Sequence, residues 1–441
     1  MGRTSKRLSL LIVLILFLLF AIGSSEGREG TIGTFCFRTG EVDAGDFPIA
    51  FCRVGIPWGA VEPEEGKFSW DAPPLKKINC FLQRGIKVIP VIRTAGAGWA
   101  VRYPSRECSS PPLDLRDRFD KRYGYSSSYY RFVREVVKRY RGAFPIVVIE
   151  NEVTARGFWC GGMDEYLRLV ATARKAIKDV DPQVKVADSG IASLCWGLLM
   201  TEALLEEGRE EEEAFQFYKT YFQEAYVRRA TSLSELYRLM RNERVREHIR
   251  KGSFLVRRLK EVVDVVNFHY YETPELFPLL VSFIRERTGK EALMNNELGT
   301  RYRLGAPQRE RRAAEDMVKK LALSVATGLE AAIWFPFSND RHHIVGLGDE
   351  RKRPISPTLN AFKTSTRLLN HPLLSYRDLS QGRVRRHSFL FPSWKVDVVW
   401  SEGEETVEVE GSCSVYDFQG FEVTRRRIKL GPSPIFIVCP Q

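Results

Sequence analysis

The sequence predicts an α/β fold, a (β/α)8 TIM barrel followed by a small antiparallel, sandwich-like β-domain. Eight short apolar runs rich in β-branched residues alternate with amphipathic segments, which is typical of parallel strands joined by crossover helices. After residue 375 the apolar residues instead recur at every second position, between Gly-rich and Pro-rich turns, which is typical of antiparallel strands. A chain of 441 residues can accommodate both parts.

The barrel strands are expected at residues 31–37, 50–57, 87–92, 146–150, 184–188, 263–268, 292–295 and 331–335. Segments 129–140 and 164–181 carry apolar residues three and four positions apart, as helices that cover a barrel should. Only residues 38–49 separate the first two strands, so the first helix is expected to be very short or missing. A charged helical insertion is expected at about 191–262, either as a solvated hairpin or as a substrate lid.

The predicted domain limits are 1–25 for a signal peptide or N-terminal anchor, 26–375 for the barrel and 376–441 for the β-domain. Within the β-domain, strands are expected at 388–391, 395–400, 406–410, 421–424 and 434–438. Because so short a domain buries little surface by itself, we expect it to pack against the barrel.

The N-terminus has the features of an export signal. Basic residues up to Arg7 precede an almost unbroken apolar run from Leu8 to Ile22 and then small residues. The run is shorter than the roughly 20 residues that cross a bilayer, which favours secretion, although an uncleaved membrane tether stays open. The expected location is therefore extracytoplasmic.

Export would permit disulfides among the eight cysteines. Cys413 and Cys439 lie in one segment, and Cys108 and Cys160 lie in two regions that we place on the same barrel face. These two pairs can form disulfides, and buried free thiols are an equally good interpretation.

Several ligand classes are disfavoured by the residue patterns. The net charge of +12 is spread over mixed-charge helical segments, without the basic and aromatic motifs that bind nucleic acid. Gly96 and Gly98 are followed by Val101 where a dinucleotide loop needs glycine, so no cofactor is expected. The cysteines lack zinc-site spacing, and His342–His343 is interpreted as a loop pair, so no metal is expected.

Two glutamates lie at the ends of predicted strands on the same barrel face. Asn151–Glu152 ends the fourth strand, and Asn296–Glu297 ends the seventh. Barrel enzymes carry out their chemistry at this C-terminal face. Retaining glycoside hydrolysis needs two carboxyl groups about 5 Å apart, one protonated and one ionised. Glu152 and Glu297 therefore form a candidate catalytic pair.

A series of motifs in fixed order resembles one clan of enzymes. The motifs lie at 51–58, 61–70, 85–90, 151–152, 166–186, 267–271, 296–299 and 333–334. They resemble the clan of retaining glycoside hydrolases that carry the acid/base on strand four and the nucleophile on strand seven, most of all the family 39 and family 5 types. The resemblance implies a glycosidase acting on an oligosaccharide or polysaccharide.

The resemblance also implies individual roles. Glu152 corresponds to the acid/base and Glu297 to the nucleophile, while Asn151 corresponds to the amide that binds the sugar 2-hydroxyl. Further substrate-site residues implied by the resemblance are Arg53 behind the nucleophile, His269 and Tyr271 at strand six, with Tyr271 bonded to the nucleophile, and Trp334 as the floor of the sugar subsite.

Other positions depart from the clan pattern or allow a second interpretation. Val153 follows Asn–Glu where the clan usually has proline, and strand three ends in Arg93 without a histidine. Arg93 can bind an acidic or sulfated sugar, and a structural ion pair is the alternative. Trp58 and Trp70 are expected in the core. A catalytically inactive barrel that binds carbohydrate is the alternative function, and the sequence leaves the sugar, the linkage and the oligomeric state open.

Overall fold

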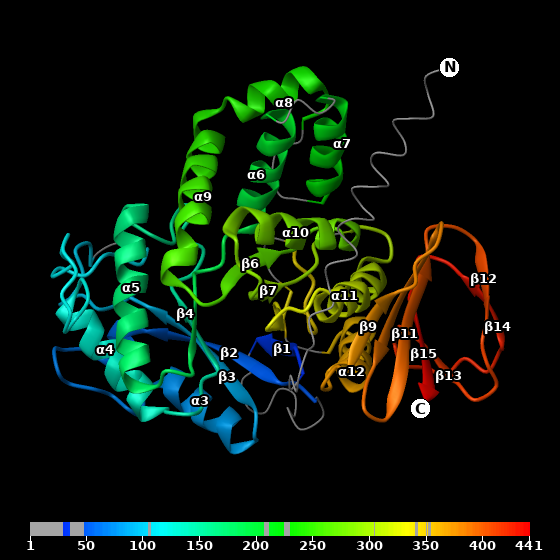
Figure 1. The fold of residues 1–441 in the computed structure, drawn as a ribbon, viewed down its shortest axis with the longest axis horizontal. Helices are drawn as coiled ribbons and strands as arrows, with labels where there is room; N and C mark the ends of the chain where they lie inside the picture. Colours follow the sequence, from blue (N-terminus) through cyan, green and yellow to red (C-terminus); the bar gives the residue numbers. More distant parts are fainter. Residues whose placement is uncertain are drawn as a thin grey trace.

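The computed structural model describes residues 30–35, 48–104, 107–206, 211–224, 230–303, 305–339, 343–349, 351 and 354–441. Eight parallel strands form its centre (Figure 1). They are β1 (Ile32–Phe35), β2 (Phe51–Pro57), β3 (Lys87–Arg93), β4 (Ile146–Ile149), β5 (Lys185–Ala187), β6 (Val266–Tyr270), β7 (Leu293–Leu298) and β8 (Ala332–Trp334).

The strands close into a barrel. Their order is β5-β4-β3-β2-β1-β8-β7-β6, and the remaining gap between β5 and β6 is spanned by parallel bridges from Ala187 to Val265 and from Ile191 to Phe268. The predicted barrel fold is thus confirmed. The sixth strand begins three residues later than predicted, because Val263 caps the preceding helix and the Asp264 carboxylate accepts a hydrogen bond from the Val186 backbone.

Helices cover the outside of the barrel (Figure 1). They are α3 (Pro73–Gln83), α4 (Ser127–Arg139), α5 (Met163–Val180), α9 (Glu243–Val262), α10 (Phe277–Thr288), α11 (Arg309–Ala326) and α12 (Ser356–Leu369), with the single turns α2 (Trp58–Val61) and η2 (Pro274–Leu276). Local chemistry sets their ends: the Ser126 hydroxyl caps α4 by accepting from the Tyr129 amide, and Gly289 ends α10 at a φ of 64°. The connection between the first two strands, 38–49, was expected to have a very short helix or none, and most of it lies outside the described residues.

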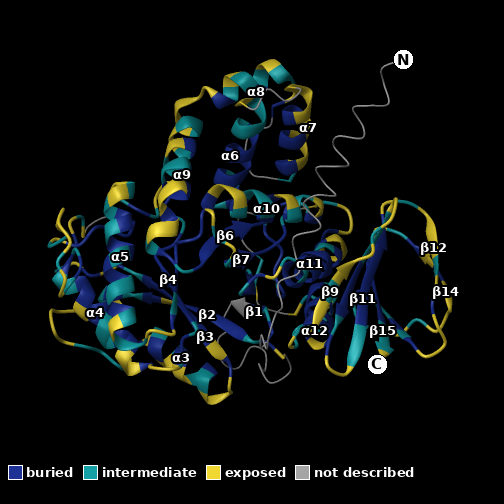
Figure 2. Ribbon diagram, in the orientation of Figure 1, coloured by how far each residue is buried: buried dark blue, intermediate teal, exposed yellow. Residues whose placement is uncertain are grey.

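Successive strand residues face two different layers of the core. One layer fills the barrel interior and consists of Phe51, Ile89, Val91, Ile146, Val148, Ala187, Val265, Met294, Ala331 and Ile333. Their neighbours, such as Val88, Ile92, Val147 and Trp334, face the helices instead. Because both faces are buried (Figure 2), the strands are continuously apolar, and each fully buried Val, Leu or Ile contributes about 1.5–3 kcal/mol. The next inward-facing position at each strand end then lies at the barrel mouth.

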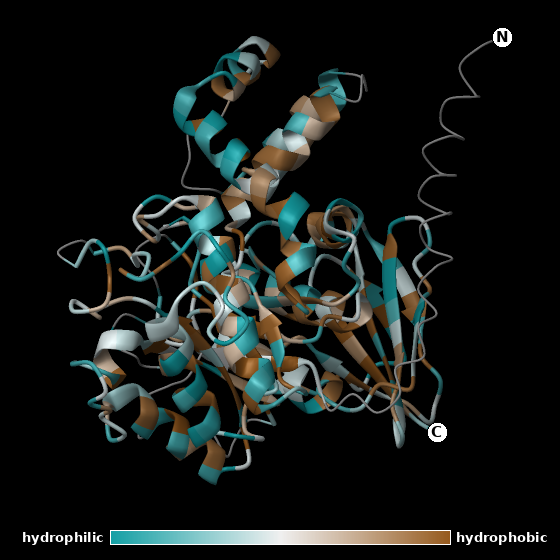
Figure 3. Ribbon diagram, turned by 60° about the vertical axis from the view of Figure 1, so that its left-hand side comes forward, coloured by the Kyte–Doolittle hydropathy of each residue, from teal (hydrophilic) through white to brown (hydrophobic). Residues whose placement is uncertain are grey.

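Between β5 and β6 the chain makes a helical excursion that rises above the barrel (Figure 1). It comprises α6 (Ser193–Glu206), α7 (Glu211–Tyr221), α8 (Leu233–Met240) and the first part of α9. The base of α6 is packed, since Trp196 is fully buried and meets Phe283 of α10 edge-on. Hydrophobic residues gather in the central strands, and the surrounding helices carry both hydrophilic and hydrophobic residues (Figure 3). No described helix is long and apolar enough to cross a membrane.

The C-terminal strands lie beside α11 and α12 (Figure 1). A five-stranded antiparallel sheet has the order β13 (Ser414–Asp417), β15 (Ile435–Pro440), β11 (Trp394–Ser401), β10 (Val384–Leu390) and β9 (Ser375–Asp378), next to the pair β12 (Glu405–Glu408) and β14 (Arg427–Leu430). The guanidinium of Arg311 lies 5.3 Å from the Phe418 ring, and the Ser433 hydroxyl donates to Glu315 at 2.6 Å. The sheet therefore packs against the barrel helices, whereas the exact domain limits stay a prediction.

One predicted strand of this region, 421–424, is wrong. Its Glu422 makes only an isolated bridge to Tyr416. The Asp417 carboxylate accepts from the backbone amides of Gln419 and Phe421 and so folds the chain into a turn just before this segment.

Two predicted disulfides are present. Cys108 is bonded to Cys160 with a Cα–Cα distance of 5.8 Å, and Cys413 is bonded to Cys439 with a distance of 4.2 Å. The free-thiol interpretation is thus wrong for these four residues. Cys52 is also in a disulfide, whereas Cys80 and Cys195 are free thiols.

Candidate active site

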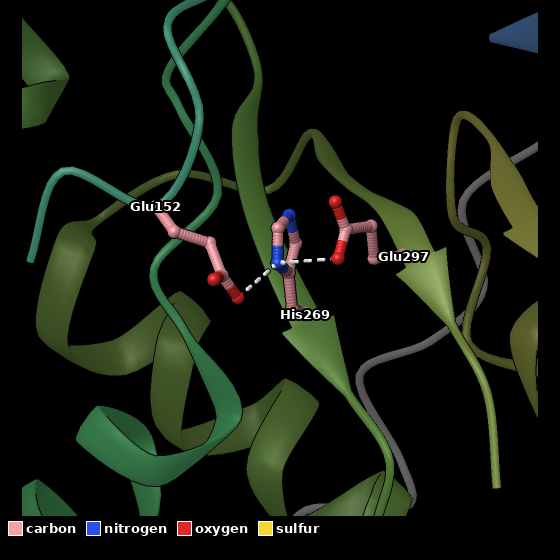
Figure 4. Close-up of side chains that lie close together, drawn as sticks. All are labelled: Glu152, His269 and Glu297. Atoms are coloured by element: carbon pink, nitrogen blue, oxygen red, sulfur yellow. Dashed lines mark hydrogen bonds and ion pairs between the residues drawn. The ribbon is translucent and has the colours of Figure 1, made fainter. Parts of the chain in front are cut away.

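Irregular backbone at three strand ends brings the predicted residues together. After β4, Glu150 and Glu152 both have left-handed backbone angles, with φ of 66° and 42°. The pairing of β6 with β7 shifts register between Asn267 and His269, and β7 also shifts against β8 before Leu298. Such bulges re-aim side chains at the rims of barrels. Glu152, His269 and Glu297 consequently point toward one another (Figure 4).

The two predicted catalytic carboxyl groups lie at the distance that retention requires. One carboxylate oxygen of Glu152, one of Glu297 and a ring nitrogen of His269 all lie within 4.8 Å of one another. His269 lies between the glutamates, with Nδ1 at 2.7 Å from Oε1 of Glu152 and 3.4 Å from Oε2 of Glu297 (Figure 4). A separation of about 5 Å allows one carboxyl group to attack a sugar carbon while the other protonates the leaving oxygen.

Glu297 is held as a carboxylate by two donors. Arg53 donates to its Oε1 at 2.5 Å, and the Tyr271 hydroxyl donates to its Oε2 at 2.5 Å. Burial by itself raises the pKa of Glu297, but the charges of His269 and Arg53 and the Tyr271 hydrogen bond outweigh burial and lower the pKa below its usual value. Glu297 is therefore ionised at neutral pH, as an attacking group must be.

Arg53 connects three strands of the barrel at this point. Its second terminal nitrogen donates to Oδ1 of Asn151 at 2.6 Å, while the first binds Glu297. The planar, rigid guanidinium fork fixes both partners in one geometry. Asn151 is thereby oriented beside Glu297, where the resemblance implies the contact to the sugar 2-hydroxyl.

His269 is fully buried and keeps a proton next to Glu152. Its Nε2 lies 2.8 Å from Oδ1 of Asn296, which also accepts from Nδ2 of Asn267, so Nε2 carries a hydrogen. Burial by itself lowers the pKa of His269, but the negative charges of Glu297 and Glu152 raise it overall. The raised pKa favours a second proton on Nδ1 of His269, the atom that lies 2.7 Å from Oε1 of Glu152.

The structure corrects the expected position of Trp334. This side chain is fully buried among the residues that face the helices, because its neighbour Ile333 fills the barrel interior. By the same alternation, the aromatic ring at the mouth is Phe335, which is partly exposed and lies 6.3 Å from the Tyr271 ring. The sequence contained this signal, since Phe335 is the next inward-facing position after Ile333.

Arg93 is part of an ion pair below the rim. Its Nε lies 3.8 Å from Oε2 of Glu150, a fully buried carboxylate, which favours the structural interpretation over an anion site. Glu150 was predicted only as the last residue of a strand. Asn267 and Asn296, whose amides orient His269, were not predicted as site residues. Polar residues within apolar strands were the available signal for all three.

The expected core position is confirmed for Trp58, which is fully buried and stacks on Phe132. Trp70 is only partly buried and packs on Phe68 at 5.0 Å at the edge of the core. Of the predicted loop pair, only His343 belongs to the described residues.

Several solved structures with a similar fold are glycoside hydrolases. A family 39 glycoside hydrolase from the gut symbiont Bacteroides cellulosilyticus WH2 matches with a TM-score of 0.59 and 16% identity over 93% of this chain and 81% of its own. A GH39 β-xylosidase from Caulobacter crescentus matches with a TM-score of 0.54 and 14% identity, over 96% and 98%. A GH30 endoxylanase from Clostridium papyrosolvens C71 matches with a TM-score of 0.54 and 14% identity, over 95% and 98%.

No protein-family model and no curated protein matches the sequence. At these identities the structural matches establish the fold, and the resemblance to family 39 is confirmed at that level. The roles of individual residues rest on the geometry of this chain.

Proposed function

We propose that the protein is a retaining glycoside hydrolase in which Glu152 is the acid/base and Glu297 the nucleophile. The observation that carries the proposal is the pair of carboxyl groups within 4.8 Å of each other in opposite surroundings. Arg53 and Tyr271 donate hydrogen bonds to Glu297 and keep it ionised, whereas the polar neighbour of Glu152 is Nδ1 of His269 at 2.7 Å. Two carboxyl groups so arranged can perform acid and nucleophilic chemistry at one pH.

The reaction proceeds in two displacements. Glu297 attacks the anomeric carbon and forms a glycosyl ester, while Glu152 gives its proton to the departing oxygen. Glu152 then takes a proton from water, which attacks the same carbon and releases Glu297. Asn151 is placed to bind the 2-hydroxyl, and Phe335 offers an apolar surface to the sugar ring.

An inactive carbohydrate-binding barrel is the competing function. Carboxyl groups splayed apart would favour it, and the short distance between Glu152 and Glu297 favours the enzyme instead. The structural neighbours named above include a β-xylosidase and an endoxylanase, so β-xylosides come first among the substrates that we propose, followed by other β-linked glycans.

Aryl glycosides of xylose, glucose, galactose, mannose, arabinose and uronic acids test this function. Glu297→Gln should abolish turnover of the active glycoside, and Glu297→Gly should recover turnover when azide replaces the missing nucleophile. Glu65→Gln is the matched control, because Glu65 is an exposed carboxylate paired with Arg131 away from the strand ends. Full activity of Glu297→Gln would contradict the assignment.

We also propose that the protein works outside the cytoplasm. The disulfides at Cys108–Cys160 and Cys413–Cys439 fit an oxidising compartment, and the apolar segment before residue 26 would direct export. That segment lies outside the described residues. Expression with and without residues 1–25, followed by fractionation, separates a cleaved signal from a membrane tether. Retention in the cytoplasm with the segment present would contradict export.

A further inference from the structure

Glu150 is a buried carboxylate that the proposed reaction does not use. It lies two residues before Glu152, immediately after β4, and has no solvent exposure. Charged side chains are almost never fully buried without partners that need the charge. Its partners therefore indicate its role.

These partners all belong to the end of β3 and the loop that follows it. Oε1 accepts a hydrogen bond from the Thr94 amide at 2.6 Å, and Oε2 faces the Arg93 guanidinium at 3.8 Å. The Ser109 hydroxyl of the same loop lies 3.5 Å from Nη2 of Arg93, and Ser109 lowers the pKa of Glu150. Burial, the largest influence, raises the pKa of Glu150, and Arg93 with these hydrogen bonds opposes the rise.

The same loop is also attached to the far end of the segment that carries Glu152. The Ser109 amide donates to the carbonyl of Phe158 at 3.0 Å, and the Cys160 amide donates to the carbonyl of Ser109 at 2.9 Å. Segment 150–160 is thus fixed to one loop at both ends.

The backbone of this segment needs such support. Glu150 and Glu152 both adopt left-handed angles that residues with side chains rarely adopt, and the surrounding structure must maintain them. On the other side, the Glu152 amide donates to the carbonyl of Ser189 at 3.0 Å, the Val153 amide donates to the Ser189 hydroxyl at 3.4 Å, and the Glu152 carboxyl group contacts His269.

We propose that Glu150 is a positioning residue, whose buried carboxylate fixes the turn that aims Glu152 at the leaving-group oxygen. The inference rests on the proposed function. It concerns the acid/base side alone, because Glu297 is fixed independently by Arg53 and Tyr271.

Leaving-group dependence separates positioning of the acid from general damage. A dinitrophenyl leaving group departs without a proton, whereas an alkyl or sugar leaving group needs general acid help worth roughly 10²–10⁴-fold. For Glu150→Gln we therefore expect kcat/KM to fall at least about tenfold for an alkyl or disaccharide substrate and less than about twofold for the dinitrophenyl glycoside. Because Glu152 also acts as base in the second step, azide should restore the kcat that Glu150→Gln loses on the dinitrophenyl substrate.

Three further variants make the outcome decisive. Glu152→Gln should show the same selectivity more strongly, and if it does not, the proposed function itself fails. Tyr271→Phe, on the nucleophile side, should slow both substrates alike. Arg93→Gln removes a partner of Glu150 that is partly exposed, and it should reproduce the selectivity more weakly if Glu150→Gln folds poorly. The inference would be overturned if Glu152→Gln is selective but Glu150→Gln and Arg93→Gln are not. In that case the two variants would lose activity equally on both substrates, or would lose none.

Discussion

Tyr271→Phe tests how the proposed nucleophile is kept ionised. The phenol donates to Oε2 of Glu297 at 2.5 Å, and burial together with the charges of Glu297 and Glu152 raises the pKa of Tyr271 far above its usual value, so it stays a donor at any working pH. Phenylalanine removes this donor and keeps the ring, which packs between the Arg301 guanidinium at 5.2 Å and the Phe335 ring. The fold should therefore be unaffected.

The magnitude follows from the strength of one charge-assisted hydrogen bond. Such a bond contributes about 1.5–3 kcal/mol, and about 1.4 kcal/mol corresponds to one pKa unit. The pKa of Glu297 should therefore rise by about 1–2 units in Tyr271→Phe. Because a protonated nucleophile cannot attack, the acidic limb of the kcat/KM profile should move to higher pH by the same amount.

The assay is kcat/KM for an aryl glycoside from pH 4 to pH 9. Tyr270→Phe is the matched control: it is the neighbouring buried tyrosine, and its hydroxyl donates to the carbonyl of Thr273, away from Glu297. It should leave the acidic limb in place. An acidic limb that does not move in Tyr271→Phe would refute the reasoning, even if the maximal rate falls.

Three further changes have defined outcomes. Arg53→Lys should lower kcat/KM about 10–100-fold, since one ammonium cannot bind both Glu297 and Asn151; a change below threefold would contradict this. Lys320 is fully buried beside the Gly299 carbonyl, and burial lowers its pKa to about 8, so the unfolded chain keeps the proton at pH values where the folded protein has lost it. Raising the pH from 8 to 10.5 should therefore stabilise the wild type relative to Lys320→Met by up to about 3 kcal/mol in urea unfolding, and parallel pH profiles would count against it. Replacing both Cys413 and Cys439 by serine should cost about 2–4 kcal/mol of unfolding free energy without loss of activity in the folded protein, and an unchanged urea midpoint would contradict this.

The barrel could be predicted because both faces of its strands are buried, which makes each strand a continuous apolar run. Runs such as Ile146–Ile149 carry this signal within a few residues. The position of Glu152 and Glu297 at the barrel mouth could be predicted, because each belongs to an Asn–Glu pair at the end of a predicted strand. The β-domain was predicted less well, since β9, β13 and β14 are short and largely polar, and side-chain turns such as that at Asp417 interrupt the period.

Other features depend on contacts that the sequence does not display. Whether Trp334 or Phe335 lies at the barrel mouth depends on which residues at the end of β8 face the barrel interior. A shift of one position exchanges the inward-facing and outward-facing residues. The role of Glu150 requires Thr94 and Ser109, more than 40 residues earlier in the chain, to meet it in space.

Covalent trapping tests the central claim most directly. An activated 2-deoxy-2-fluoro glycoside of the sugar found by screening should form a stable ester, because the fluorine slows release of the intermediate. Peptide mass spectrometry should then place the sugar on Glu297, within Leu293–Leu298. A label on Glu150, on Glu152 or on a residue elsewhere would contradict the account.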